Sequence, residues 1–207
     1  GNKGLSQQRT KKILIVLKRN GRYLIVNHSE AEDSYASFKY TDFILNFLNS
    51  FPKEIRKNLY LKPYPEEHLL LDPIEPIIKK KFPDLKIFKT HFDLKRIISQ
   101  FGLVILTHNS TSFIEMMGLN KPCILTVNPE ISFVRKDAEK YFNQIKKVGI
   151  FHDNIDTTIS HISNVSDKIN LWWNKNEVVE ARKDFCNRFS RTNNNNLQII
   201  KKILIEK

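Results

Sequence analysis

Residues 103–129 read LVILTHNSTSFIEMMGLNKPCILTVNP, and this stretch decides the fold. An apolar run at 103–106 ends in a turn, residues 107–112, that is rich in hydroxyl and amide groups. A helix follows, ends at Gly118, and leads through Lys121-Pro122 into a second apolar run at 123–127. A strand, a turn, a helix and a second strand in this order indicate a parallel α/β sheet.

The same alternation runs along the rest of the chain. Strands are predicted at 12–17, 59–61, 85–88, 103–106, 123–127 and 148–151, with a further extended piece at 22–26. Helices are predicted at 40–51, 73–81, 93–100, 133–147 and 156–165, and residues 166–207 are predicted to be helical apart from an asparagine loop at 193–196. The pattern predicts a Rossmann-like α/β fold with helices on both faces of a parallel sheet. We therefore assign residues 1–165 to a donor-nucleotide-binding domain and residues 166–207 to C-terminal helices packed on it.

The turn at 107–112 is the first candidate site. In open parallel sheets ligands bind beyond the carboxyl ends of the strands, where this turn lies. The free N–H groups of a first helical turn attract anions, and side-chain hydroxyls beside them can complete a phosphate site. The alternative is that Ser110 or Thr111 caps the helix and no ligand is involved. The predicted donor-binding residues of the turn are Thr107, Asn109, Ser110, Thr111 and Ser112.

Three residues outside the turn are added to the predicted donor site. Glu115 lies four residues after Thr111 on the same helix face, where a carboxylate can accept hydrogen bonds from a ribose diol. Lys62 ends a predicted strand in Lys62-Pro63-Tyr64-Pro65, so it either meets a donor phosphate or carboxylate or is an exposed lysine at a strand that proline stops. His152 follows the strand at 148–151 and is predicted to lie near the donor sugar or base.

Other chemistry is weakly indicated. His108 either points into the site or shapes the turn, and His68 and His91 are candidates only because histidine titrates near neutrality. The tryptophan pair at 172–173 is predicted to pin the C-terminal helices to the sheet. No Ser-His-Asp order, paired carboxylates or metal-ligand spacing is present, so we expect no metal and no cofactor beyond the donor substrate.

Composition limits the partners. The net charge of +12 is spread over all segments and favours anionic partners such as nucleotides or phospholipid head groups. No nucleic-acid motif accompanies it, so no nucleic-acid partner is expected. No apolar run approaches the length of a membrane span, and the two cysteines suit a reducing compartment. We expect a cytoplasmic protein, possible peripheral contact with the inner face of an anionic membrane, and, since the chain begins with Gly, a fragment of a longer protein.

Residues 103–189 resemble the C-terminal half of a family of GT-B-type transferases of bacterial surface-carbohydrate biosynthesis. The matching motifs are an N-S-T turn at 109–111 followed by Glu115 and Lys121-Pro122, the VGIFH element at 148–152, and a tail with Trp172-Trp173, Ala181-Arg182, Phe185-Cys186 and Arg188. More distantly the layout is similar to sialyltransferase-like and CDP-glycerol glycerophosphotransferase enzymes. Tyr64 stands where those enzymes carry a histidine before proline, and this difference argues against CMP-sugar chemistry.

The resemblance implies a donor-binding half of a metal-independent glycosyltransferase. Its substrates would be a nucleotide-activated sugar and a lipid-linked or saccharide acceptor, and an N-terminal acceptor domain would lie outside this chain. The product would be surface polysaccharide or glycolipid. Two alternatives stay open: transfer of an alditol phosphate from a CDP-activated donor, and a non-catalytic interaction module on the same fold.

Overall fold

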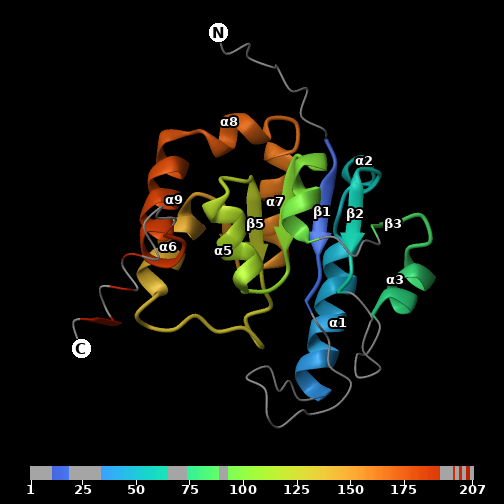
Figure 1. The fold of residues 1–207 in the computed structure, drawn as a ribbon. Coiled ribbons are helices and arrows are strands. Elements are labelled where there is room, and N and C mark those ends of the chain that lie inside the picture. Colours follow the sequence, from blue (N-terminus) through green and yellow to red (C-terminus); the bar gives the residue numbers. More distant parts are fainter. Residues whose placement is uncertain are drawn as a thin grey trace.

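The computed structural model describes residues 11–18, 34–64, 74–88 and 93–191, together with residues 198, 201, 204 and 205. Within these ranges six strands form one sheet in the order β3-β2-β1-β4-β5-β6, and every neighbouring pair is parallel (Figure 1). The strands are β1 (Ile13–Val16), β2 (Leu59–Lys62), β3 (Lys86–Ile87), β4 (Leu103–Leu106), β5 (Cys123–Thr126) and β6 (Phe151–His152). The predicted Rossmann-like α/β fold is confirmed.

The central strands explain why the sheet is parallel and enclosed. All four residues of β1, of β4 and of β5 are buried. Strands covered on both faces are continuous apolar runs rather than alternating ones, because neither side meets water. β1 pairs with β2 on one side and with β4 on the other, so Ile13 lies opposite both Leu59 and Leu103.

Helices connect the strands and cover both faces. The chain moves from β1 to β3 in one direction and from β4 to β6 in the other, and right-handed crossovers then put the two sets of helices on opposite faces. Figure 1 shows α1 to α3 gathered toward the β2–β3 side, and α6, α8 and α9 toward the β5 side. The helices are α1 (Ser34–Asn49), α2 (Lys53–Arg56), α3 (Glu75–Lys81), α4 (Leu94–Ile97), the 3₁₀ turn η1 (Ile98–Gln100), α5 (Thr111–Gly118), α6 (Glu139–Lys147), α7 (Ile155–Val165), α8 (Ile169–Trp173) and α9 (Asn176–Phe189).

The C-terminal helices hold the end of α5 in place. Phe185 of α9 packs edge-on against Phe113 of α5, with ring centroids 5.5 Å apart. The Trp173 indole N–H donates to the Asn120 side-chain oxygen over 2.9 Å, and the Arg182 guanidinium donates to the same oxygen. Arg182 also stacks 4.2 Å from the centroid of the Trp173 ring. Trp173 therefore fixes the turn that follows α5, whereas the Trp172 indole N–H donates to the Val148 carbonyl over 2.9 Å.

Most predicted boundaries are within one or two residues of the structure, and three differ by more. The first helix begins at Ser34 rather than at residue 40, and α6 begins at Glu139 rather than at residue 133. Residues 133–138 stay outside the helix in the long connection after β5, which an ion pair of 2.9 Å between Glu130 and Lys39 ties to α1. The predicted strand 148–151 moves to Phe151–His152, because Gly149 has a φ of 79° that no strand residue adopts. The extended piece at 22–26, His68, His91 and the loop at 193–196 lie outside the described residues.

Two features are absent from the described residues. No helix there combines the length and the apolar character needed to cross a bilayer. No group of three or more histidine, cysteine, aspartate or glutamate side chains in those ranges is arranged to hold a metal ion.

Candidate functional site

A cavity of about 550 Å³ opens where the strand order reverses, between the carboxyl ends of β1 and β4. Crevices at this point are the usual ligand sites of doubly wound sheets, because the connections on either side leave in opposite directions. None of the described residues that line the cavity is acidic. The lining residues are Lys18, Tyr40, Tyr64, Thr107, His108, Asn109, Ser110, Thr111, Ser112, Asn128, Ile131 and Ser132.

A chain of hydrogen bonds braces the floor of this cavity. The backbone N–H of Lys18 donates to the Tyr40 hydroxyl over 2.9 Å. The Tyr40 hydroxyl lies 2.7 Å from Thr107 Oγ1, which in turn donates to the Val16 carbonyl over 2.9 Å. Since Thr107 Oγ1 gives its proton to Val16, the Tyr40 hydroxyl is the donor between the two. The network joins the ends of β1 and β4 to α1.

The network changes the role expected of Thr107. Its side chain is 2% exposed, and its hydroxyl is engaged on both sides. Thr107 therefore holds the turn in position. The same network brings Lys18 to the cavity, with its ammonium 4.4 Å from the centroid of the Tyr40 ring.

The start of α5 leaves polar groups available to the cavity. Ser110 is the N-cap residue in extended conformation, with a φ of −146°, but its side chain makes no capping bond. The Ser110 hydroxyl is buried without a hydrogen-bond partner. The described structure also records no acceptor for the backbone N–H groups of Thr111 and Ser112, while Phe113 N–H bonds back to Ser110. The capping interpretation of Ser110 is thus not what the structure shows, and an unmet buried hydroxyl costs about 1–3 kcal/mol.

His108 lies beside these groups. Burial, and after it the charge of Lys18, lowers the pKa of His108 to about 4, so the imidazole is neutral near pH 7. Its Nδ1 atom is buried without a hydrogen-bond partner. A neutral imidazole offers one donor and one acceptor, which makes His108 able to bind a polar ligand atom without adding charge.

Three of the predicted donor-binding residues do not line this cavity. Glu115, on α5, forms an ion pair of 3.1 Å with Lys95 of α4. Lys62 ends β2, where burial lowers its pKa against the opposing influence of Asp93. The predicted contacts of Glu115 with a ribose and of Lys62 with a donor anion stay predictions.

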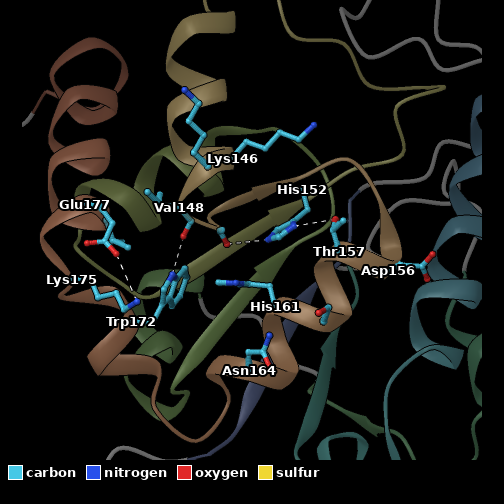
Figure 2. Close-up of a pocket in the computed structure, with 14 residues that line it drawn as sticks. Lys146, Val148, His152, Asp156, Thr157, His161, Asn164, Trp172, Lys175 and Glu177 are labelled. Carbon is cyan, nitrogen blue, oxygen red and sulfur yellow. Dashed lines mark hydrogen bonds and ion pairs between the residues drawn. The ribbon is translucent and has the colours of Figure 1, made fainter.

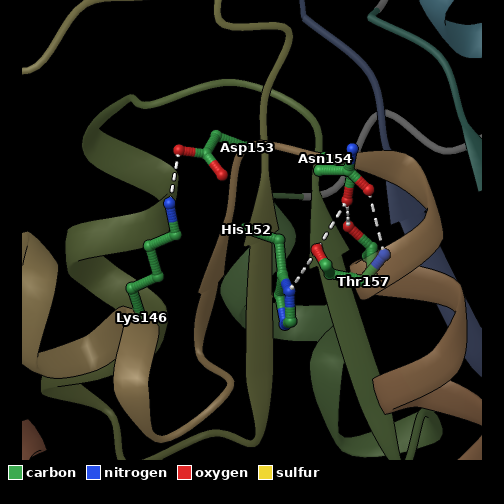
Figure 3. Close-up of polar contacts among 6 residues, drawn as sticks. Lys146, His152, Asp153, Asn154 and Thr157 are labelled. Carbon is green, nitrogen blue, oxygen red and sulfur yellow. Dashed lines mark hydrogen bonds and ion pairs between the residues drawn. The ribbon is translucent and has the colours of Figure 1, made fainter.

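His152 lies in a second cavity at the free edge of the sheet. Its Nε2 is 3.1 Å from the Gly149 carbonyl. Its Nδ1 is 3.3 Å from Thr157 Oγ1, the contact drawn in Figure 3. The carbonyl can only accept, so Nε2 carries the proton. The ring closes the turn between α6 and β6 and is held there, away from the first cavity.

Sequence reasoning missed several residues of the first cavity. Lys18 and Asn128 directly follow predicted strands, so the rule that ligands sit at the carboxyl ends of strands was enough to find them. Ile131 and Ser132 lie in the connection after β5, and the sequence predicts a helix for the second half of this connection, residues 133–138. Tyr40 carries no signal in the sequence, because it reads as one more apolar residue of an amphipathic helix.

The fold and the cavity together define a doubly wound α/β protein with a polar cavity at the switch point of its sheet. The chain belongs to the LIC12162 family of transferases: the family model described as LIC12162 family transferase matches residues 1–204. No curated protein sequence matches the chain. Among solved structures it resembles the solution NMR structure of ALG13, with 12% identity, coverage of 77% of this chain and 87% of that chain, and a TM-score of 0.45. A likeness this slight carries no argument about function.

Proposed function

We propose that this chain is the donor-binding part of a metal-independent glycosyltransferase, which takes its sugar from a nucleotide-activated donor. Membership of a transferase family supports the general class of reaction. The observation that carries the choice of donor is the cavity at the switch point, which combines unbonded N–H groups, hydroxyls and a lysine with no described carboxylate. Such a lining favours an anion, and the phosphates of a nucleotide supply one.

The donor phosphates would lie against the N-terminus of α5. There the N–H groups of Thr111 and Ser112, which have no acceptor among the described residues, and the hydroxyls of Ser110, Thr111 and Ser112 would serve as hydrogen-bond donors. The ammonium of Lys18 supplies full positive charge at the same cavity. Charge develops on the departing nucleotide during transfer, and fixed donors at that place lower the barrier without having to reorganise.

The finer parts of the proposal rest on the family resemblance. The acceptor would be lipid-linked or a saccharide, the product surface polysaccharide or glycolipid, and the acceptor would be held by a further domain. The excess of lysine and arginine, 34 against 22 acidic residues, suits peripheral contact with an anionic membrane at the cytoplasmic face.

Calorimetry tests the donor site. The purified chain is titrated with CMP, CDP, UDP and GDP, and one of the diphosphates is expected to bind best because it presents more anionic oxygens to the α5 N-terminus. Ser110→Ala removes a buried hydroxyl that forms no bond in the protein, so stability is expected to rise by up to about 1–3 kcal/mol. The affinity is expected to fall roughly tenfold or more, as for the loss of a hydrogen bond to a charged group. Ser163→Ala, at an exposed position of α7, is the matched control.

Two results would overturn the proposal: no nucleotide binds at millimolar concentration, or Ser110→Ala binds as tightly as Ser163→Ala. Product mass in a complete reaction then separates glycosyl transfer from alditol phosphate transfer, since the second leaves a phosphodiester. A non-catalytic module would give neither product.

A further inference from the structure

The second cavity, of about 640 Å³, lies on the outer side of β6, the edge strand of the sheet (Figure 2). It shares no described lining residue with the cavity at the switch point. Its walls come from α7, from the end of α6 and from the start of α9. It is thus a separate place on the molecule with its own chemistry.

One wall is a polar helix face. Thr157, Ser160, His161 and Asn164 recur at the spacing that puts side chains on one side of a helix, and all four line the cavity. Thr157, Ser160 and Asn164 are exposed, whereas His161 is half-buried. In the part of the chain that the structure describes, the side chains of Ser160 and Asn164 form no hydrogen bond. The face therefore presents hydrogen-bonding capacity that the protein itself leaves unused.

His161 is the most deeply set group of this wall. Figure 2 shows its ring between Trp172 and His152, whose ring centroids lie 4.9 Å and 5.4 Å from its own. A Cβ at Gly149 would fall 2.3 Å from its Cε1 atom, so glycine there leaves the space that the imidazole occupies. Its Nε2 atom is buried and has no hydrogen-bond partner. Burial lowers the pKa of His161 to about 4, which leaves the ring neutral near pH 7.

The mouth of the cavity carries both signs of charge. Lys146, Lys147 and Lys175 line it together with Asp156 and Glu177. Lys175 lies 3.7 Å from Glu177 in a pair of which both side chains are more than half exposed, and exposed pairs exchange partners at little cost. A phosphate, which only accepts hydrogen bonds, would meet the repulsion of the two carboxylates. A ligand rich in hydroxyls can donate to the carboxylates and accept from the lysines.

We infer that this cavity binds a saccharide, as a second site apart from the donor site. Carboxylates, ammonium groups, an amide and a neutral imidazole around one hollow match a ligand whose every hydroxyl both donates and accepts. The inference rests on the proposed function for its place in the reaction: the sugar bound here belongs to the acceptor or to the growing product. His161 and Asn164 are its central contacts.

An NMR titration tests the inference on the whole chain. The ¹⁵N-labelled protein is titrated with glucose, N-acetylglucosamine and glucuronic acid, and with inorganic phosphate as the anion control. The Trp172 indole signal reports on the cavity that it lines, and the Trp173 indole, which bonds to Asn120 elsewhere, is the internal reference. At least one sugar is expected to shift the Trp172 signal and leave that of Trp173 in place, whereas phosphate shifts neither.

Two variants locate the contact. Asn164→Ala and His161→Phe, which keeps a ring but removes both nitrogens, are each expected to weaken sugar binding roughly threefold to tenfold, the worth of one hydrogen bond. Asn187→Ala, at an exposed position of α9, is the control. The inference is overturned if no sugar shifts Trp172, if phosphate shifts it equally, or if both variants bind like Asn187→Ala. The amide signals of Thr111 and Ser112 report nucleotide binding in the same spectra, so the two sites can fail independently.

Discussion

The substitution Thr111→Pro isolates the backbone from the side chains in the donor site. Thr111 is the first residue of α5, and its N–H has no acceptor within the described structure. Proline is well tolerated at the first helical position, because its missing N–H is one that the helix does not use. Ser110 before it is extended, with φ and ψ of −146° and 178°, which is the conformation that a following proline requires.

The expected result is a folded protein that has lost one donor to the phosphates. Stability should change by no more than about 0.5 kcal/mol, as for a substitution that breaks no native contact. A hydrogen bond to a charged group contributes about 1.5–3 kcal/mol, so the affinity for the best-binding nucleotide should fall roughly 10- to 100-fold. Calorimetry gives the affinity and denaturant unfolding gives the stability.

Thr111→Ala is the matched control, because it removes the side-chain hydroxyl and keeps the N–H. If Thr111→Pro folds normally and binds the nucleotide as well as Thr111→Ala does, the helix N-terminus is not the phosphate site and the reasoning is refuted. If Thr111→Ala loses as much as the proline variant, the hydroxyl rather than the backbone binds the ligand.

Three further predictions concern the framework around the two cavities. Tyr40→Phe removes the hydroxyl that links the ends of β1 and β4, and denaturant unfolding should show a loss of about 1–3 kcal/mol, whereas an unchanged stability would mean that this network is not structural. Gly149→Ala should destabilise by at least about 1–2 kcal/mol, because a φ of 79° is unfavourable for alanine and its Cβ meets the His161 ring. Gly118→Ala, with no positive φ and only the tip of a serine side chain in its way, should cost less, and equal losses would contradict this account. Stability should also fall as the pH drops from about 6.5 toward 4, because the buried His108 and His161 stay neutral in the folded chain while their unfolded forms take up protons. Each histidine accounts for a loss of at most about 3 kcal/mol in the free energy of unfolding. In His108→Asn the dependence of stability on pH should be weaker, and an unchanged pH profile in that variant would contradict the buried state of this ring.

The fold was readable from the sequence because its strands are enclosed on both faces. β4 and β5 each contain four consecutive buried residues, and these give apolar runs that a strand with one exposed face would not have. The turn and the helix between the two runs are then recognised by their position. The ends of helices and strands were predicted wrongly where contacts between distant segments determine the backbone conformation. The connection after β5 is the clearest case, since its ion pair from Glu130 reaches Lys39 on α1.

The candidate site was readable only in part. Helical spacing put Glu115 on a face of α5 but did not say which element that face meets, and it meets Lys95 of α4. The position of α4 depends on the crossover from β3 to β4, which no local pattern describes. His152 was predicted to follow a strand, but it is the last residue of β6, which is the outer edge of the sheet and lies beyond the switch point. Only the order of the strands shows that His152 and the turn at 107–112 belong to different cavities.

The amide spectrum of the ¹⁵N-labelled chain, recorded during titration with a nucleoside diphosphate, tests most directly whether the N-terminus of α5 binds phosphate. We predict that the backbone signals of Thr111 and Ser112 shift first and most, together with that of His108, while the Trp172 indole signal stays in place. Shifts that cluster around Trp172 and His161, or no shift at millimolar nucleotide, would contradict it.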